Sequence, residues 1–202
     1  MRMRNIALLP IALAITVTLA ACGGTPEAAV TDDPVVTATP EPEETGGPVD
    51  RVFTMPADCL GILPEARQQT FADQNLVLLG GPGGLYENYY ADPTPEEQAG
   101  GISCIWGDEA VPESTITVSV APLNASTRSV VVDNLIEQGL NEAPLDDGIS
   151  YAQLGDENSA PAILNIVRDE SWVSVIEALG GEAFFDEAVE LASEISDQVY
   201  SP

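Results

Sequence analysis

The chain of 202 residues contains no histidine and no lysine, and its basic side chains are six arginines. Without histidine there is no imidazole base for a serine or cysteine nucleophile, and no histidine ligand for zinc. Without lysine there is no Schiff-base nitrogen and no P-loop. No catalytic motif is present either. We therefore predict that the protein is not an enzyme and has no catalytic residues, no metal site and no cofactor.

Acidic side chains are abundant instead. The 33 aspartates and glutamates give a formal net charge of −27. This charge repels phosphate backbones, so we predict that the protein does not bind nucleic acid. The charge has two interpretations. It keeps a domain soluble and away from anionic membrane surfaces, or it favours a basic partner protein or a cationic ligand. The first interpretation requires no partner, and it is the one that the sequence favours.

The beginning of the chain has the layout of a secretory signal. Arg2 and Arg4 precede an apolar run of 15 residues, Ile6–Ala20. A membrane-spanning helix needs about 20 apolar residues, so this run is short for a span. The run ends Leu19-Ala20-Ala21-Cys22. These observations predict a signal peptide over residues 1–21 and an exported protein.

The four residues Leu19-Ala20-Ala21-Cys22 resemble the lipobox of bacterial lipoproteins. This resemblance implies that the signal peptide is removed and that Cys22 carries a diacylglycerol. Two acyl chains anchor a protein stably, whereas one holds it only marginally. The resemblance thus implies a protein held by lipid at the outer face of the cell membrane. The alternative is an ordinary signal peptide that happens to be followed by a cysteine.

A tether and a single domain follow Cys22. Residues 22–50 are rich in proline, threonine and glutamate, lack aromatic residues and show no apolar periodicity. Such a segment cannot bury enough surface to offset its ordering entropy, so we predict a disordered tether. Residues 51–202 are long enough to form one hydrophobic core, and we predict a single globular domain there.

The apolar periodicity of residues 51–202 predicts an α+β fold. We expect helical structure near residues 55–63 and from Pro64, a helix over 126–140 capped by Ser126 or Thr127, and a helix over 182–199. The expected strands are residues 102–106, 115–120, 149–154, 161–168 and 172–178, the last two joined as a hairpin. This order predicts an antiparallel sheet of about five strands, with the helices packed on one face.

Cys59 and Cys104 are the cysteines that remain when Cys22 is committed to lipid. In an exported domain such a pair favours a disulfide. The bond closes a loop of about 46 residues, which the chain-entropy relation values at about 4 kcal/mol. The alternative, a redox-active pair, lacks the Cys-x-x-Cys spacing typical of that chemistry.

The residues around these cysteines carry a second resemblance. Asp58-Cys59-Leu60, followed by Ile102-Ser103-Cys104-Ile105-Trp106, resembles small actinobacterial secreted lipoproteins and the extracellular sensor domains of actinobacterial membrane kinases. The resemblance implies ligand binding or a role in envelope assembly, and it brings no catalytic residues. Trp106 is predicted to pack against the disulfide as part of the core.

A long loop from Gly80 to Gly101 holds Tyr86, Tyr89 and Tyr90, three of the five tyrosines of the chain. Long loops in compact domains are usually functional, and tyrosine gives contact area at low entropic cost. We predict a candidate binding loop formed by these tyrosines. The alternative is that one or two of the rings fold back and cover a sheet edge.

Together these observations predict a lipid-anchored extracytoplasmic module that binds an envelope protein or a small apolar ligand held against its sheet. The alternatives are a secreted hydrolase that uses paired carboxylates, and a surface module that binds nothing.

Overall fold

The computed structural model describes residues 51–86, 89–111 and 114–201. The predicted signal peptide, Cys22 and the predicted tether lie outside these residues. Within the described ranges, no helix combines the length and the apolar character that a membrane crossing requires.

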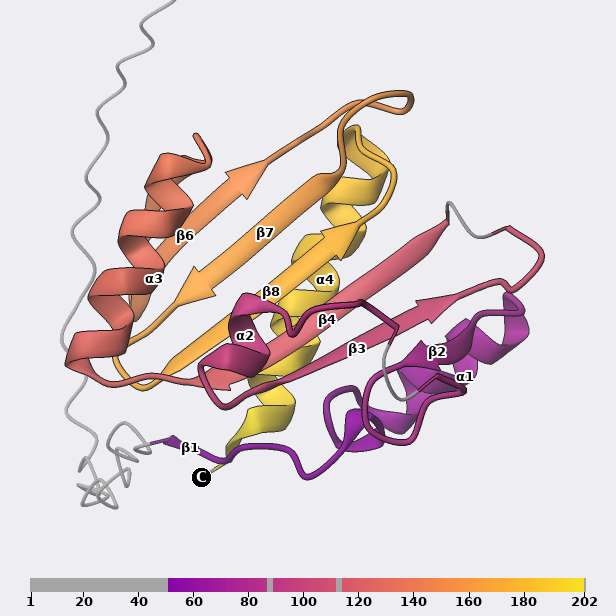
Figure 1. The fold of residues 1–202 in the computed structure, drawn as a ribbon, viewed down its shortest axis with the longest axis horizontal. Coiled ribbons are helices and arrows are strands. Elements are labelled where there is room, and N and C mark those ends of the chain that lie inside the picture. Colours follow the sequence, from indigo (N-terminus) through magenta and orange to yellow (C-terminus); the bar gives the residue numbers. More distant parts are fainter. Residues whose placement is uncertain (1–50, 87–88, 112–113, 202) are drawn as a thin grey trace, which may run out of the picture. The chain divides into compact units, whose positions relative to one another are not determined.

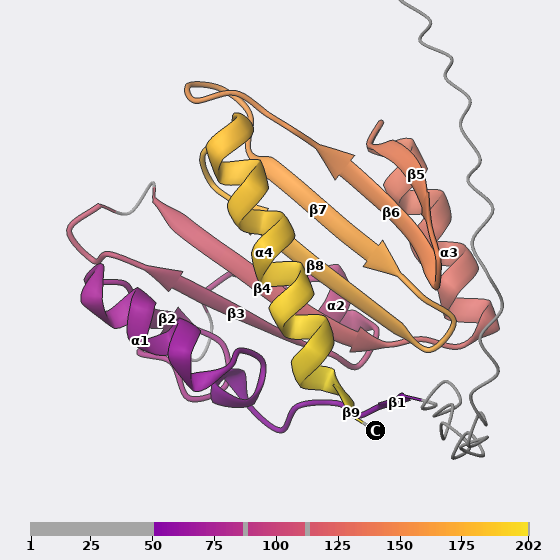
Figure 2. The same ribbon diagram turned by 180° about the vertical axis from the view of Figure 1, so that it is seen from behind.

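The core of the domain is an antiparallel sheet of seven strands in the order β2-β3-β4-β8-β7-β6-β5 (Figures 1 and 2). The strands are β2 Val77–Gly80, β3 Ile102–Gly107, β4 Thr115–Pro122, β5 Asn141–Leu145, β6 Gly148–Gln153, β7 Ala162–Val167 and β8 Ser171–Glu177. All five expected strands and the β7–β8 hairpin are confirmed. The expected number of about five is wrong, because β2 and β5 add one strand at each edge.

Both additional strands lack the alternation by which a strand is recognised in a sequence. β2 has four residues, the last of which is Gly80, and Gly81 follows it directly. Every residue of β5 is exposed, and Pro144 lies within it. An edge strand tolerates proline because one side of its backbone has no ladder partner. Neither strand therefore carries a periodic apolar signal.

Helices cover both faces of the sheet, so the prediction that they pack on one face is wrong. Figure 2 shows α4 (Glu182–Val199) across one face, with α1 (Glu65–Asp73) beside it. Figure 1 shows α3 (Ala125–Glu137) and the short α2 (Pro95–Gln98) over the opposite face. The reason is that strand β8 carries apolar side chains on both faces, with Val173 and Val175 packed in the cluster under α4 and Trp172 in the cluster under α3, so both faces need cover.

Two separate hydrophobic clusters result. The larger lies under α4 and contains Val118, Val173, Val175, Leu191 and Ile195, all completely buried. The smaller lies under α3 and is built from Ala121, Leu123, Val131, Leu135, Leu140, Tyr151, Val167 and Trp172. The expected bounds of the helix over 182–199 are confirmed.

The beginning of α3 differs from the prediction. Its N-cap is Asn124, whose Oδ1 accepts hydrogen bonds from the backbone amides of Ser126 and Thr127. The Thr127 hydroxyl in turn accepts from the Asn124 amide, at 2.9 Å. An asparagine side chain reaches these free amides as well as serine does, so the two expected caps lie inside the first turn instead.

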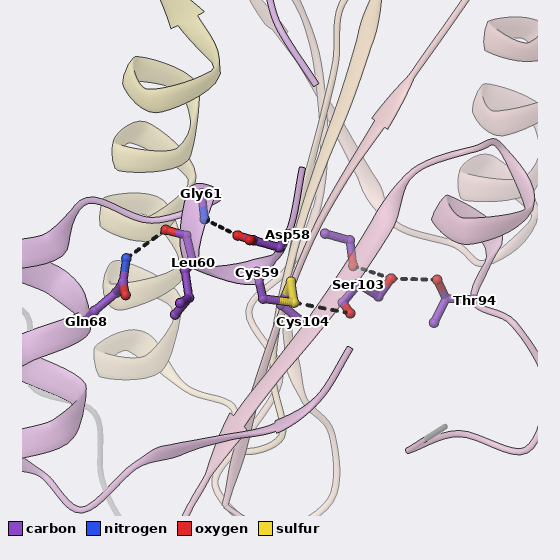
Figure 3. Close-up of a disulfide and its surroundings, with 9 residues drawn as sticks. Asp58, Cys59, Leu60, Gly61, Gln68, Thr94, Ser103 and Cys104 are labelled. Carbon is purple, nitrogen blue, oxygen red and sulfur yellow. Dashed lines mark hydrogen bonds between the residues drawn. A yellow bond between two sulfur atoms is a disulfide. The ribbon is translucent and has the colours of Figure 1, made fainter. Parts of the chain in front are cut away.

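The predicted disulfide between Cys59 and Cys104 is confirmed (Figure 3). It joins the short 3-10 helix η1 (Cys59–Gly61) to β3. Trp106 belongs to the same buried cluster as both cysteines, and its ring lies 5.8 Å from that of Phe71. Trp106 is therefore a core residue, as predicted. Gly81 lies next to the disulfide and has a φ of +96°, a conformation that favours glycine. A Cβ at this position would collide with Ser103 O and crowd Cys59 Sγ.

The two ends of the domain meet beyond α4. A two-stranded antiparallel pair joins β1 (Val52–Phe53) to β9 (Tyr200–Ser201). The Tyr200 hydroxyl is hydrogen-bonded to the Ser171 hydroxyl at 2.6 Å, and the Arg168 guanidinium lies over the Tyr200 ring.

Candidate functional site

A groove runs across the sheet face that carries α2 and α3. One cavity of about 480 Å³ lies over the middle of the sheet, and another of about 810 Å³ lies between the two helices. Both cavities are lined by Pro95, Leu135, Gln138 and Trp172, so they adjoin. We call this combined feature the α2–α3 groove.

The floor of the groove is polar. Thr117 and Ser119 from β4, Ser174 from β8 and Asn165 from β7 line the first cavity. All four side chains are buried, and they alternate along their strands with apolar residues, such as Val118, Leu164 and Val173, that pack under α4. We call these four residues the polar floor. The signal for this floor in the sequence is the alternation Thr117-Val118-Ser119-Val120, which places two polar side chains on one face of the strand.

Hydrogen bonds fix the floor and the helix above it. Figure 3 shows Thr94 hydrogen-bonded to Ser103, their hydroxyl oxygens 2.6 Å apart. Ser119 donates to Ser103 at 2.8 Å. Thr94 also caps α2, since its hydroxyl accepts from the Glu97 amide while the Glu97 carboxylate accepts from the Thr94 amide. Thr94 therefore connects the beginning of α2 to strand β3, because the same hydroxyl caps the helix and is hydrogen-bonded to Ser103.

Trp172 lies where the two cavities adjoin. Its side chain is buried, and its indole N–H donates to Asn165 Oδ1 at 2.9 Å. A buried indole usually finds such a partner. The bond orients the Asn165 amide, which is part of the polar floor.

Glu96 is the buried carboxyl group of the groove. It follows the N1 proline of α2, and only 5% of the residue is exposed. Burial raises the pKa of Glu96, while hydrogen bonds from its own backbone amide, Ser174 and Thr94 act in the opposite direction. A carboxyl group with little solvent and no basic neighbour favours its neutral form. Glu96 was not among the predicted site residues, because no motif distinguishes it among the 33 acidic residues of the sequence.

The three tyrosines of the predicted binding loop differ in their contribution to the site. Tyr90 lines the groove, and its hydroxyl is hydrogen-bonded to that of Thr117 at 3.2 Å. Tyr90 and Tyr89 also line a neighbouring cavity of about 400 Å³, and their rings meet edge-on at 5.3 Å. Tyr86 is exposed and forms a bridge with Gly80, at the end of edge strand β2. Tyr90 thus fits the binding alternative, and Tyr86 fits the sheet-edge alternative.

The groove is acidic. Its lining includes the carboxyl groups of Asp92, Glu96 and Glu137, and among the described residues that line it none is basic. The four arginines of the described residues form ion pairs elsewhere: Arg51 with Asp197, Arg67 with Glu187, Glu190 and Glu194, Arg128 with Asp169, and Arg168 with Asp147. An anionic ligand therefore meets no compensating positive charge here.

In the described part of the chain, the acidic residues and cysteines form no group of three or more that could hold a metal ion. The chain matches no protein-family model, no curated protein and no solved structure. Its function is therefore inferred from the geometry of the groove.

Proposed function

We propose that this protein is a lipid-anchored extracytoplasmic lipoprotein that binds a small ligand in the α2–α3 groove. The observation that carries the binding role is the polar floor: four buried hydrogen-bonding side chains beneath a concavity on a rigid sheet. Small-molecule sites are typically concave and place a few polar groups within a largely apolar lining. Here the apolar part is supplied by Val130, Val131 and Leu135 of α3.

The anchor rests on the lipobox resemblance, with Cys22 as the attachment site. We expect the native protein to sediment with membranes and its first residue to be Cys22 carrying a diacylglycerol, as measured by mass spectrometry. The variant Cys22→Ser should be found in the soluble fraction. Recovery of an unmodified chain that begins at Met1 would contradict this part of the proposal.

The groove is tested by blocking it at an exposed position. Val130 lines the cleft between α2 and α3 and is 58% exposed, so Val130→Trp fills the cleft without disturbing the core. Val189 on α4, 47% exposed on the other side of the sheet, gives the matched control Val189→Trp.

The native protein and both variants are purified from membranes, and the small molecules extracted from each are identified by mass spectrometry. We expect a molecule that accompanies the native protein and Val189→Trp to be depleted at least tenfold from Val130→Trp. Equal amounts with all three proteins, or none above a protein-free blank, would refute binding in the groove.

A carboxylate-dependent hydrolase is the second candidate. It is favoured by the buried Glu96 with its raised pKa, a property that a general acid requires, and by Asp92 in the lining of the same cavity. This candidate predicts that the protein hydrolyses chromogenic glycosides and that Glu96→Gln and Asp92→Asn each abolish the activity. Absence of hydrolysis by the native protein over a panel of such substrates would reject it.

A further inference from the structure

The ligand class follows from the charge and shape of the α2–α3 groove, and this inference rests on the proposed binding function. We propose that the groove takes an organic amine with an apolar body: the body lies between α2 and α3, and the ammonium group pairs with Glu96.

Charge complementarity is the first argument. Each carboxyl group that lines the groove lacks an arginine partner among the described residues, whereas the four described arginines are engaged at other places. The neighbouring cavity adds Glu97 to the same acidic surroundings. A positive ligand is attracted to such a site, and an anionic ligand is repelled.

The position of Glu96 is the second argument. Its carboxyl group is buried beside Ser174 and Thr94, at the end of the groove where the polar floor lies. Burying a carboxylate without a cation is costly, and an ammonium group placed against it offsets that cost. Tyr90 lines the same cavity, and the face of its ring is a favourable neighbour for a cation.

The other end of the groove offers apolar contacts beside polar ones. Between α2 and α3 the lining includes Pro95, Ala99, Val130, Val131 and Leu135. Trp172 and Leu135 line both cavities. One ligand can therefore place its apolar body between the helices and its charged group over the polar floor. A small inorganic cation would leave this apolar end empty, which is why we propose an organic amine.

The test uses three probes of one shape and different charge: benzylammonium, benzyl alcohol and benzoate. Each is titrated calorimetrically into the native lipidated protein in phosphatidylcholine vesicles, and the heat with protein-free vesicles is subtracted. We expect benzylammonium to bind at least tenfold more tightly than benzyl alcohol, and benzoate to give no measurable binding.

Two pairs of variants locate the site. Glu96→Gln should weaken benzylammonium about tenfold and leave benzyl alcohol unchanged, whereas Glu182→Gln, an exposed site at the start of α4, should change neither. Because Glu96 is buried, a substitution there can also disturb the fold, and the second pair therefore uses exposed positions. Val130→Arg should weaken benzylammonium several-fold, and Val189→Arg should not.

The outcomes separate this inference from the proposed function. Equal binding of benzylammonium and benzyl alcohol, with Val130→Arg weakening both, would overturn the amine and leave a groove that binds ligands. Equal losses in Glu96→Gln and Glu182→Gln would show attraction by the general negative charge only, which also overturns it. If none of the probes binds, the amine is rejected, and the molecules that accompany the native protein decide the proposed function separately.

Discussion

Arg67 on α1 donates hydrogen bonds to both carboxylate oxygens of Glu194 on α4. Its Nε donates to Oε2 and its Nη2 to Oε1, each at 2.8 Å. The same guanidinium donates to Glu190 at 2.9 Å and lies 3.7 Å from Glu187. These contacts raise the pKa of Arg67 further above its ordinary value, with the Glu194 hydrogen bonds as the largest cause. Arg67 therefore ties α1 to α4 on one face of the sheet.

Replacing Arg67 tests this link. Arg67→Met keeps the length of the side chain but leaves three glutamates of α4 without their shared cation. We expect a loss of about 1.5–3 kcal/mol in the free energy of unfolding, measured with urea, since hydrogen bonds to charged groups contribute in that range. The control is Arg51→Met, whose pair with Asp197 is exposed on both sides and should change stability by less than about 0.5 kcal/mol. Equal losses in the two variants would contradict a special role for Arg67.

Glu177 should make stability depend on pH. It is 97% buried at the end of β8, and its Oε1 has no hydrogen-bond partner among the described residues. Burial, and the nearby negative charge of Glu187, raise the pKa of Glu177 from 4.5 to about 8, while Arg67 lowers it. Between these two values the folded chain keeps a proton that the unfolded chain releases. The stability contributed by this group is thus complete below pH 4.5 and falls as the pH rises towards 8, by at most about 1.4 kcal/mol per pH unit.

The measurement is urea unfolding of the native protein and of Glu177→Gln at pH 5 and pH 8. The variant carries no ionisable group at this position, so it should gain stability relative to the native protein as the pH rises. Other carboxyl groups titrate in both proteins and cancel in the difference. A difference between the two proteins that is the same at both pH values would show that Glu177 ionises normally.

Loss of the disulfide should destabilise the domain strongly. Cys59 and Cys104 are 45 residues apart in sequence, and both are completely buried. For this loop length the chain-entropy relation gives about 4 kcal/mol. We expect Cys59→Ala with Cys104→Ala to lose about 2–5 kcal/mol, and reduction of the native protein to have a similar effect. The double variant itself should not respond to reductant. A loss below about 1 kcal/mol would mean that core packing alone holds η1 to β3.

Removing one partner of the hydrogen bond from Trp172 to Asn165 should destabilise the domain more than removing both partners. Trp172→Phe removes the donor and leaves the Asn165 amide oxygen buried without its partner, at a cost of about 1–3 kcal/mol. Adding Asn165→Leu to Trp172→Phe removes the unpaired group, so the double variant should recover part of the loss in urea unfolding. A double variant with the summed losses of the two single variants would show that the bond contributes nothing of its own.

Several elements were predictable because their signal is local. The helix over residues 182–199 has apolar residues at helical spacing, and the strands at the centre of the sheet are rich in β-branched residues. Proline and an acidic residue at 64 and 65 mark the start of α1. The edge strands were not predictable in this way: all of β5 is exposed, so its pairing with β6 decides its conformation rather than its own side chains.

The site depended still more on pairing between distant segments. Thr117, Ser119, Asn165 and Ser174 are ordinary polar residues in three separate strands, and they form one floor only because β4, β8 and β7 are neighbours in the sheet. Glu96 acquires its character from burial against that floor. Of the predicted tyrosines, the structure places Tyr90 in the groove and leaves Tyr86 exposed.

The α+β class and the central elements follow from apolar periodicity, which is a property of the chain alone, and the pairing of Cys59 with Cys104 follows from the cysteine count once Cys22 is assigned to lipid. The composition also excluded lysine and histidine chemistry. Three features emerge from packing instead: helices cover both faces, β2 and β5 complete the sheet, and Glu96 is buried above a polar floor. The physical reason is that burial and the loss of water around a carboxyl group arise from segments distant in sequence, which no local pattern records.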